Sequence, residues 1–150
     1  MGNCKRRIVP MRLEDIPAIL ELEADTLSAW SREHLEDELQ QQTGFQFVVR
    51  NEAAEMIQAV LCGRIMTDEA EILKLSVAEK ARKKGMGYHL LDFVLNYCSA
   101  KGVKKCFLEL RASNTAARNL YEKRGFFRVA SRKDYYDEPV EDATVMQLEL

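Results

Sequence analysis

Residues 73–91 read LKLSVAEKARKKGMGYHLL, an apolar strand followed by a basic turn and the start of a helix with one apolar stripe. The turn consists of Arg82, Lys83, Lys84, Gly85, Met86 and Gly87. The first N–H groups of a helix have no intrahelical acceptor and carry partial positive charge, and glycine lets a ligand approach the backbone closely. The turn therefore predicts a phosphate-binding site, with a basic glycine turn of no binding function as the alternative.

The turn matches neither of two common nucleotide-binding motifs. It lacks the G-x-x-x-x-G-K-[ST] of a P-loop, and the G-x-G-x-x-G of a dinucleotide-binding fold fails at His89-Leu90. If it binds phosphate, it belongs to another class of phosphate-binding turn.

The composition is that of one globular domain spanning residues 1–150. Of the 150 residues, 47% are hydrophobic and 31% are charged. The chain contains no internal repeat, no Pro- or Gly-rich linker, no apolar run long enough to span a bilayer and no apolar signal segment. We therefore expect a cytoplasmic protein with no membrane partner.

Cysteine and histidine content argues against a metal site. The cysteines are Cys4, Cys62, Cys98 and Cys106, with no C-x-x-C pair among them. Only His34 and His89 could add nitrogen ligands, and we expect both to be structural or surface residues. Cys98 and Cys106 fall at apolar positions of a helix and a strand, where thiols are more often inert than reactive. The sequence thus predicts reduced thiols, no metal and no cysteine nucleophile.

Charge is unevenly distributed along the chain. The net charge of −2 does not suit a dedicated nucleic-acid-binding protein. Residues 80–133 hold 14 Lys and Arg against three acids, whereas residues 134–150 hold six acids and no base. The basic middle favours an anion site, and the acids of residues 33–38 and 134–142 favour a negative rim that attracts a cationic partner. A solvated surface is the alternative.

Hydrophobic periodicity predicts seven strands and four helices in the order β-α-α-β-β-β-α-β-α-β-β, and hence an α+β fold. The predicted helices are one containing Ile16, Ile19, Leu20 and Leu27, one starting at the N-cap Ser31, one through residues 90–98 and one through residues 114–124 with Gly125 as its C-cap. The predicted strands with defined boundaries are residues 45–49, 56–66, 71–77, 106–110, 126–129 and 144–148.

The basic turn and the segments after it resemble the GCN5-related N-acetyltransferases. The turn matches that family's pyrophosphate loop, R/Q-x-x-G-x-G/A. Residues 108–114, LELRASN, and the pattern N-x-x-A-x-x-L-Y-x-x-x-G-F over residues 114–126 match the family's next strand and helix. The resemblance covers residues 6–150. It implies a three-layer α/β/α fold whose mixed, mostly antiparallel seven-stranded sheet is splayed between strands four and five, with acetyl-CoA as cosubstrate and no metal.

Three segments are most similar to N-terminal acetyltransferases of that family, in particular those that modify the N-terminal alanine of a small-subunit ribosomal protein. They are LELRASN, Ala29-Trp30-Ser31, and Tyr135-Tyr136 followed by Glu141-Asp142-Ala143. The resemblance implies a protein N-terminus as acceptor, and the acidic segments favour a basic ribosomal tail. The turn is more basic than the family needs, and Ala29 replaces a frequent proline. Transfer to a small amine or a lysine, and a catalytically silent CoA-binding subunit, are the alternatives.

Glu109 is the candidate general base. It stands in the middle of a strand, where a carboxylate is unusual, on the face opposite Leu108 and Leu110. Structural pairing with Arg111 or with a neighbouring strand is the alternative. The resemblance implies a base that acts through water on an α-amine, whose ordinary pKa of about 7.7–8.0 requires only modest basicity.

Tyr121 is the candidate general acid. It shares a helical face with Ala117 and Leu120, so burial in the core is the alternative. The resemblance implies that its phenol protonates the departing thiolate, in direct transfer within a ternary complex. Asn114 either caps the helix or, by the same resemblance, contacts the pantetheine arm of the cofactor.

The resemblance also implies the remaining binding residues. Backbone groups of Leu75 and Val77 would pair with pantetheine, an N–H near Val77 would polarise the thioester carbonyl, and residues 82–87 would hold the pyrophosphate. Trp30, Tyr135 and Tyr136 would line the acceptor site, with the two tyrosines as a loop pair. Packing of Trp30 against Leu35 at the start of a helix is its alternative role.

Overall fold

The computed structural model describes residues 6–150. The strands are β1 (Arg6–Pro10), β2 (Gly44–Asn51), β3 (Met56–Met66), β4 (Glu69–Val77), β5 (Lys105–Arg111), β6 (Phe127–Tyr136) and β7 (Glu141–Glu149). The α-helices are α1 (Ile16–Leu22), α2 (Arg32–Leu39), α3 (Met86–Ala100) and α4 (Thr115–Arg124), and two short 3-10 helices are η1 (Leu13–Asp15) and η2 (Glu79–Ala81). Over these residues, the order of strands and α-helices is the predicted one.

The seven strands form one sheet in the order β1-β2-β3-β4-β5-β7-β6. β4 and β5 are parallel, and every other neighbouring pair of these strands is antiparallel. The sheet is therefore mixed and mostly antiparallel, as expected from the sequence.

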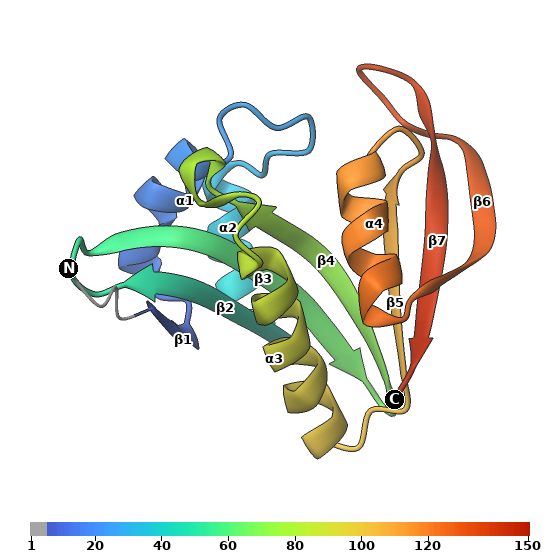
Figure 1. Ribbon diagram of the computed structural model, residues 1–150, viewed down its shortest axis with the longest axis horizontal. Coiled ribbons are helices and arrows are strands. Elements are labelled where there is room, and N and C mark those ends of the chain that lie inside the picture. Colours follow the sequence, from blue (N-terminus) through green and yellow to red (C-terminus); the bar gives the residue numbers. More distant parts are fainter. Residues whose placement is uncertain (1–5) are drawn as a thin grey trace.

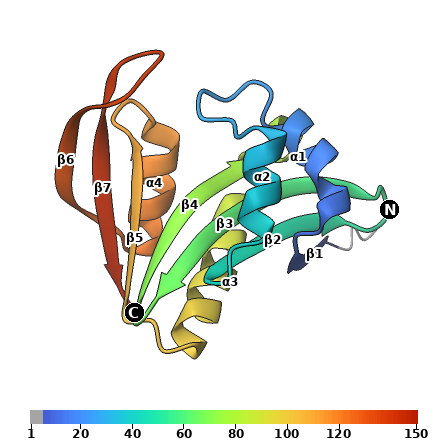
Figure 2. The ribbon, with the colours of Figure 1, turned by 180° about the vertical axis from the view of Figure 1, so that it is seen from behind.

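Helices cover both faces of the sheet (Figures 1 and 2). α3 and α4 pack on one face, where Leu90 and Leu108 belong to the main core. α1 and α2 pack on the other face over the β1–β4 half, where Ile16, Leu35 and Val60 belong to a second core. The three-layer arrangement is confirmed. In the part of the chain that the structure describes, no helix covers this second face of β5, β7 and β6 (Figure 2).

The two halves of the sheet diverge between β4 and β5. These strands pair at four positions only, from Glu69 opposite Lys105 to Ile72 opposite Leu108. β4 continues to Val77 along β3, and β5 continues along β7, so the strands separate beyond Ile72 (Figure 1). The predicted splay is confirmed, and the second half of β4 has no strand partner on its β5 side.

Local sequence signals fix the helix ends. The Ser31 side chain accepts a hydrogen bond from the backbone N–H of His34 at the start of α2. The Asn114 side chain accepts one from the backbone N–H of Ala117 at the start of α4, and Gly125 ends that helix with a φ of 109°. The predicted caps of both helices are confirmed.

Other boundaries were predicted wrongly. α1 ends at Leu22, and Leu27 lies in the following loop with 64% of its surface exposed, so its helical spacing was fortuitous. β6 extends to Tyr136 and β7 begins at Glu141, so Tyr135 and Tyr136 end a strand and do not form a loop pair. The sequence predicted only residues 126–129 of this strand, because its second half is largely polar and exposed at the sheet edge, where hydrophobic alternation gives no signal.

Candidate active site

A cleft of about 580 Å³ opens where β4 and β5 diverge. Its walls come from these two strands, the loop after α1, the first half of α4 and the end of β6. The predicted site residues that line it are Trp30, Leu75, Arg82, Glu109, Asn114, Tyr121, Tyr135 and Tyr136. Val77 and residues 83–87 are not part of its wall and lie at the end of β4 and the start of α3. The cleft therefore joins the candidate catalytic residues to the candidate acceptor residues.

The turn before α3 leaves the first helical N–H groups without a side-chain cap. Gly85 is the N-cap, with a φ of 77° that disfavours a β-carbon, although a β-carbon there would meet no atom within 4 Å. At Gly87 a β-carbon would lie 3.3 Å from Leu120 and 3.4 Å from Val77, so this glycine allows close packing. The Met86 side chain is buried in the main core, which leaves only its backbone for a ligand. These features suit phosphate binding by backbone groups.

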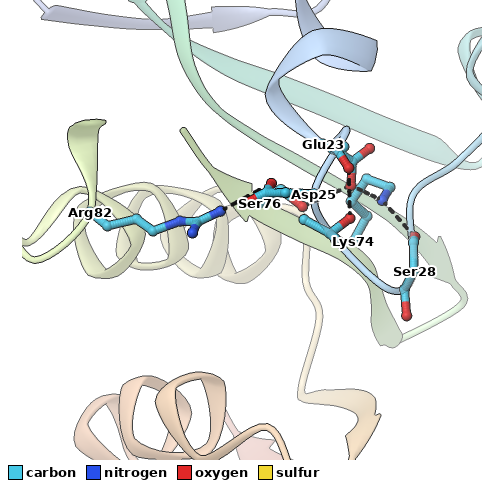
Figure 3. A network of polar contacts seen from close by, with 7 residues as sticks. Glu23, Asp25, Ser28, Lys74, Ser76 and Arg82 are labelled. Carbon is cyan, nitrogen blue, oxygen red and sulfur yellow. Dashed lines mark hydrogen bonds and ion pairs between the residues drawn. The ribbon is translucent and has the colours of Figure 1, made fainter. Parts of the chain in front are cut away.

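Arg82 connects the turn to the loop after α1. Its Nε donates to the backbone oxygen of Val77 at 3.0 Å, and its Nη2 lies 3.7 Å from Oδ1 of Asp25 (Figure 3). Lys83 and Lys84 are exposed beside it. All three cations of the turn are exposed, but Arg82 has protein partners, whereas Lys83 and Lys84 form no ion pair within the described residues.

Glu109 lies just beyond the point where the strands separate. Its side chain is 19% exposed, and its Oε1 lies 3.2 Å from Nε of Arg132 on β6. Glu109 therefore does have an ion-pair partner, but it is Arg132 of β6, which β7 separates from β5, and neither Arg111 nor a residue of an adjacent strand as predicted. Because the Arg132 side chain is 57% exposed, this ion pair is weak and leaves the carboxylate accessible to a ligand.

Tyr121 lies at the boundary between the core and the cleft. Its ring is buried edge-to-face against Phe126, with ring centroids 5.6 Å apart, and the residue also lines the cleft. Burial, with smaller contributions from Cys106 and Tyr136, raises the pKa of the Tyr121 hydroxyl. The phenol is therefore protonated at neutral pH and can act as a donor.

Arg111 holds the β6–β7 turn against the end of β5. It donates to the backbone oxygens of Pro139 at 2.9 Å and Asp137 at 3.1 Å, and its Nη1 lies 3.4 Å from Oε1 of Glu141. Its guanidinium carbon lies 4.5 Å from the centroid of the Tyr136 ring. The site wall formed by the end of β6 thus depends on one buried arginine.

Tyr135 and Tyr136 place two phenols beside Glu109. Their rings meet edge-to-face, with centroids 5.1 Å apart. A side-chain hydrogen bond to Glu109 raises the pKa of Tyr135, and burial, followed by the charge of Glu109, raises the pKa of Tyr136 to about 12. Both phenols are protonated at neutral pH.

Lys74 holds the opposite wall, and sequence reasoning missed it. Its ammonium forms an ion pair with Glu23, donates to the backbone oxygen of Ser28 at 3.3 Å and lies 4.6 Å from the centroid of the Trp30 ring. The Ser76 hydroxyl donates to Oε2 of the same glutamate at 2.9 Å (Figure 3). The only signal in the sequence was a lysine interrupting the apolar run LKLSV.

Trp30 both packs at the start of α2 and lines the cleft, and its role in acceptor binding stays a prediction. It packs against the second core, which contains Leu35, and its ring stacks on His34 with centroids 3.9 Å apart. It also lines the cleft. Trp30 is therefore a wall residue fixed by the start of α2.

Two further candidates, Asn114 and Leu75, line the cleft, and Val77 lies just beyond its wall at the end of β4. Asn114, whose side chain caps α4, lines the wall. Leu75 and Val77 pair with β3 and have no β5 partner, so one edge of this strand segment can accept an extended ligand.

The described thiols are inert at neutral pH. Burial raises the pKa of Cys62 and Cys106 to about 12 and that of Cys98 to about 11. Cys4 lies outside the described residues. Within residues 6–150, no three His, Cys, Asp or Glu side chains gather as a metal site would require, and no helix is long and apolar enough to cross a membrane.

Several acids of the expected negative rim have structural partners. Glu38 is buried and pairs with Arg64 at 3.0 Å, Glu141 binds the end of β5, and Asp142 accepts a hydrogen bond from the backbone N–H of Asp134 at 2.8 Å. The acids that line the cleft are Glu23, Asp25, Glu71 and Glu109. Negative charge at the cleft therefore comes from the first loop and the diverging strands.

Comparisons with known proteins agree with this geometry. The sequence model of the Acetyltransferase (GNAT) family matches residues 16–126. A Bacillus subtilis (strain 168) protein, to which ribosomal protein bS18-alanine N-acetylation is provisionally ascribed, is 31% identical over 144 residues, 95% of this chain and 94% of that protein. The ribosomal protein bS18-alanine N-acetyltransferase of Salmonella typhimurium is 34% identical over 98 residues, 64% of this chain and 66% of that protein.

Solved structures show the same fold. The ribosomal-protein-S18-alanine N-acetyltransferase of Escherichia coli superposes with a TM-score of 0.87 at 28% identity, covering 97% of this chain and 94% of that one. Ard1 of Thermoplasma volcanium superposes with a TM-score of 0.88 at 23% identity, covering 97% of each chain, and supports the fold alone.

The Lys74–Glu23 pair yields a stability prediction. Lys74→Met should lower the free energy of unfolding by about 3–5 kcal/mol, because it leaves a buried carboxylate without its cation. The double variant Glu23→Gln/Lys74→Met should recover most of that loss. Urea unfolding measures both effects.

Arg7→Met is the control, since Arg7 and Glu52 form an exposed ion pair. This substitution should lower the free energy of unfolding by less than about 1 kcal/mol. A double variant no more stable than Lys74→Met would show that packing, and not the unpaired charge, causes the loss.

Proposed function

This chain belongs to the acetyltransferase (GNAT) family, and on that premise we propose that it transfers acetyl from acetyl-CoA to the N-terminal α-amino group of a protein. The observation that carries the proposal is the single cleft shared by Glu109 and Tyr121, which lies between the uncapped start of α3 and the wall that contains Trp30. A base and an acid that face one cleft are what transfer between an amine and a thioester needs.

The proposed acceptor is the N-terminal alanine of a small-subunit ribosomal protein, with a basic tail. Relatives of this chain are named for acetylation of that residue in ribosomal protein bS18. Three of the four acids on the cleft wall are paired with cations, and Glu71, which has no ion-pair partner within the described residues, favours a cationic chain. Such an acceptor would place the enzyme in the cytoplasm.

The residues present fit acetyl-CoA. The N–H groups at the start of α3 and the exposed Lys83 and Lys84 suit the pyrophosphate, and the free edge of β4 at Leu75 and Val77 suits the amide groups of pantetheine. Asn114 lies on the wall along the same path. Bound acetyl-CoA supplies the acetyl group as a thioester.

In the proposed mechanism, Glu109 accepts a proton from the acceptor amine through a water molecule. The neutral nitrogen attacks the thioester carbonyl, which a backbone N–H near Val77 polarises. As the C–N bond forms and the C–S bond breaks, Tyr121 donates its proton to the departing sulfur. The nitrogen, which becomes cationic on attack, loses its second proton through the same water once Glu109 has released the first proton to solvent, and Tyr121 is reprotonated from solvent. Direct transfer agrees with the burial of the three described thiols, none of which lines the cleft.

Incubation with acetyl-CoA and synthetic peptides tests this function. The set contains alanine-initiated peptides, the same peptides with a blocked N-terminus and an internal lysine, and a small polyamine, and mass spectrometry locates the acetyl group. We expect acetylation at the α-amine of the unblocked peptides. Modification of lysine or polyamine only would refute the proposed acceptor, and no transfer at all would favour a silent CoA-binding subunit.

Glu109→Gln should lower kcat by about 10²-fold at neutral pH while acetyl-CoA affinity is retained. The loss should shrink as pH rises towards and above the amine pKa of about 8, because more acceptor is then already deprotonated. Steady-state kinetics from pH 6 to 9.5, roughly the range over which an α-amine titrates, measure this change.

Arg132→Gln is the matched control, because it removes the ion-pair partner of Glu109 and keeps the carboxylate. It should retain most of the activity. A Glu109→Gln defect that is equal at every pH would assign Glu109 a structural role.

Tyr121→Phe should slow turnover by about 10²-fold without loss of acetyl-CoA binding, because only the proton donor is removed. The ring contact with Phe126 is kept. Thiol release followed with a chromogenic reagent gives kcat, and calorimetry gives the affinity. Tyr97→Phe is the control, since Tyr97 packs on Phe47 away from the cleft. Wild-type turnover in Tyr121→Phe would leave Tyr121 a core residue only.

A further inference from the structure

Glu71 lies at the apex of the gap between β4 and β5. It stands opposite Phe107, and the parallel pairing ends one residue later with Ile72 opposite Leu108. Glu109 is the first residue of β5 beyond that last pair. The two carboxylates therefore flank the point of separation. Both line the main cleft and also a smaller cleft of about 220 Å³, so the two clefts meet at this pair.

Both carboxylates belong to the sheet face away from α3 and α4. On β5, Leu108 and Leu110 belong to the core beneath these helices, so Glu109 between them points the other way. On β4, Ile72 belongs to the same core and Glu71 alternates with it. A cofactor held at the start of α3 reaches the gap from the helical face, and an acceptor meets the carboxylates from the opposite face.

Glu71 forms no ion pair within residues 6–150. Arg64 stands opposite it on β3, but the Arg64 guanidinium pairs with Glu38 at 3.0 Å. Arg132, the other arginine of the smaller cleft, pairs with Glu109 at 3.2 Å. Glu71 is therefore a partly buried carboxylate beside a second carboxylate, with both nearby arginines engaged elsewhere.

This arrangement is electrostatically unfavourable without a cationic ligand. Burial, followed by repulsion from Glu109, raises the pKa of Glu71 against the opposing effect of Arg64 and Arg132. A cation in the gap would offset both effects, because it would interact with two carboxylates at once. An α-amino group, with a pKa of about 7.7–8.0, arrives mostly protonated at neutral pH and is such a cation.

We propose that Glu71 and Glu109 together bind the protonated amino group of the acceptor, with Glu71 holding the ammonium at the apex of the gap. The inference rests on the proposed function and adds a second carboxylate to it. Glu71 also stabilises the positive charge that nitrogen acquires as it attacks, while Glu109 accepts the proton. A Lys or Arg side chain of the acceptor carries the same charge, and the experiment below separates the two sources.

Glu71→Gln tests the proposal, with Glu69→Gln as the matched control. Glu69 lies two residues earlier on the same strand, is exposed and lines only the smaller cleft. Protein saturated with CoA, which carries no acetyl group to transfer, is titrated by calorimetry with an alanyl peptide. A second titration uses the propionyl analogue, which lacks only the amino group.

Wild-type protein and Glu69→Gln should bind the alanyl peptide at least about tenfold more tightly than the propionyl analogue, the effect of one charged hydrogen bond. Glu71→Gln should lose most of this preference, with unchanged affinity for CoA and for the propionyl analogue. Equal preferences in Glu71→Gln and wild type, or no preference in wild type, would overturn the proposal.

A third peptide with an added lysine near its N-terminus identifies the bound cation. If Glu71→Gln loses affinity only for this lysine-containing peptide, Glu71 recognises a side chain of the acceptor, and its assignment to the amino group is overturned. The titrations do not depend on turnover. If wild-type protein acetylates no α-amine, the proposed function fails while the binding comparison still decides the role of Glu71.

Discussion

The site depends on the early end of the parallel pairing between β4 and β5. Four residue pairs hold these strands together, and beyond Ile72 and Leu108 each strand follows a different half of the sheet. The separation exposes one backbone edge of β4 and opens a cleft in the middle of the domain, where a continuous sheet would have none. The start of α3, the loop after α1 and the end of β6 are all arranged around that gap (Figure 1).

Two buried cations, Lys74 on β4 and Arg111 on β5, hold the two walls of the cleft through the same three kinds of contact. Each is less than 9% exposed, pairs with a carboxylate, donates to backbone oxygens of a loop or turn and lies over an aromatic ring of the wall. Trp30 is that ring on one side and Tyr136 on the other. Because breaking a buried pair costs far more than breaking an exposed one, these contacts fix the walls in the free protein. The cleft is thereby preorganised.

The sheet also separates the two substrates of the proposed reaction. Phosphate-binding features lie at the start of α3 on the helical face, whereas Glu71 and Glu109 belong to the face that no helix covers at β5 within the described residues. In the proposed reaction, the two reactants would approach the gap from opposite faces and meet at its apex. This geometry favours direct transfer and needs no covalent relay through the protein.

The sequence by itself determined the features that depend on local chemistry. Hydrophobic periodicity and caps such as Asn114 gave the order of elements and several helix ends, because each signal acts within a few residues. Phosphate binding by the glycine turn before α3 stays a prediction of the same local kind. Glu109 was found because a charge in mid-strand breaks a local pattern. Tertiary structure alone decided how far β6 extends, the partners of Arg111, the loop contacts of Lys74 and the position of Glu71 at the apex. These depend on which distant segments meet when the sheet diverges, and no local pattern encodes the contacts of a buried charge.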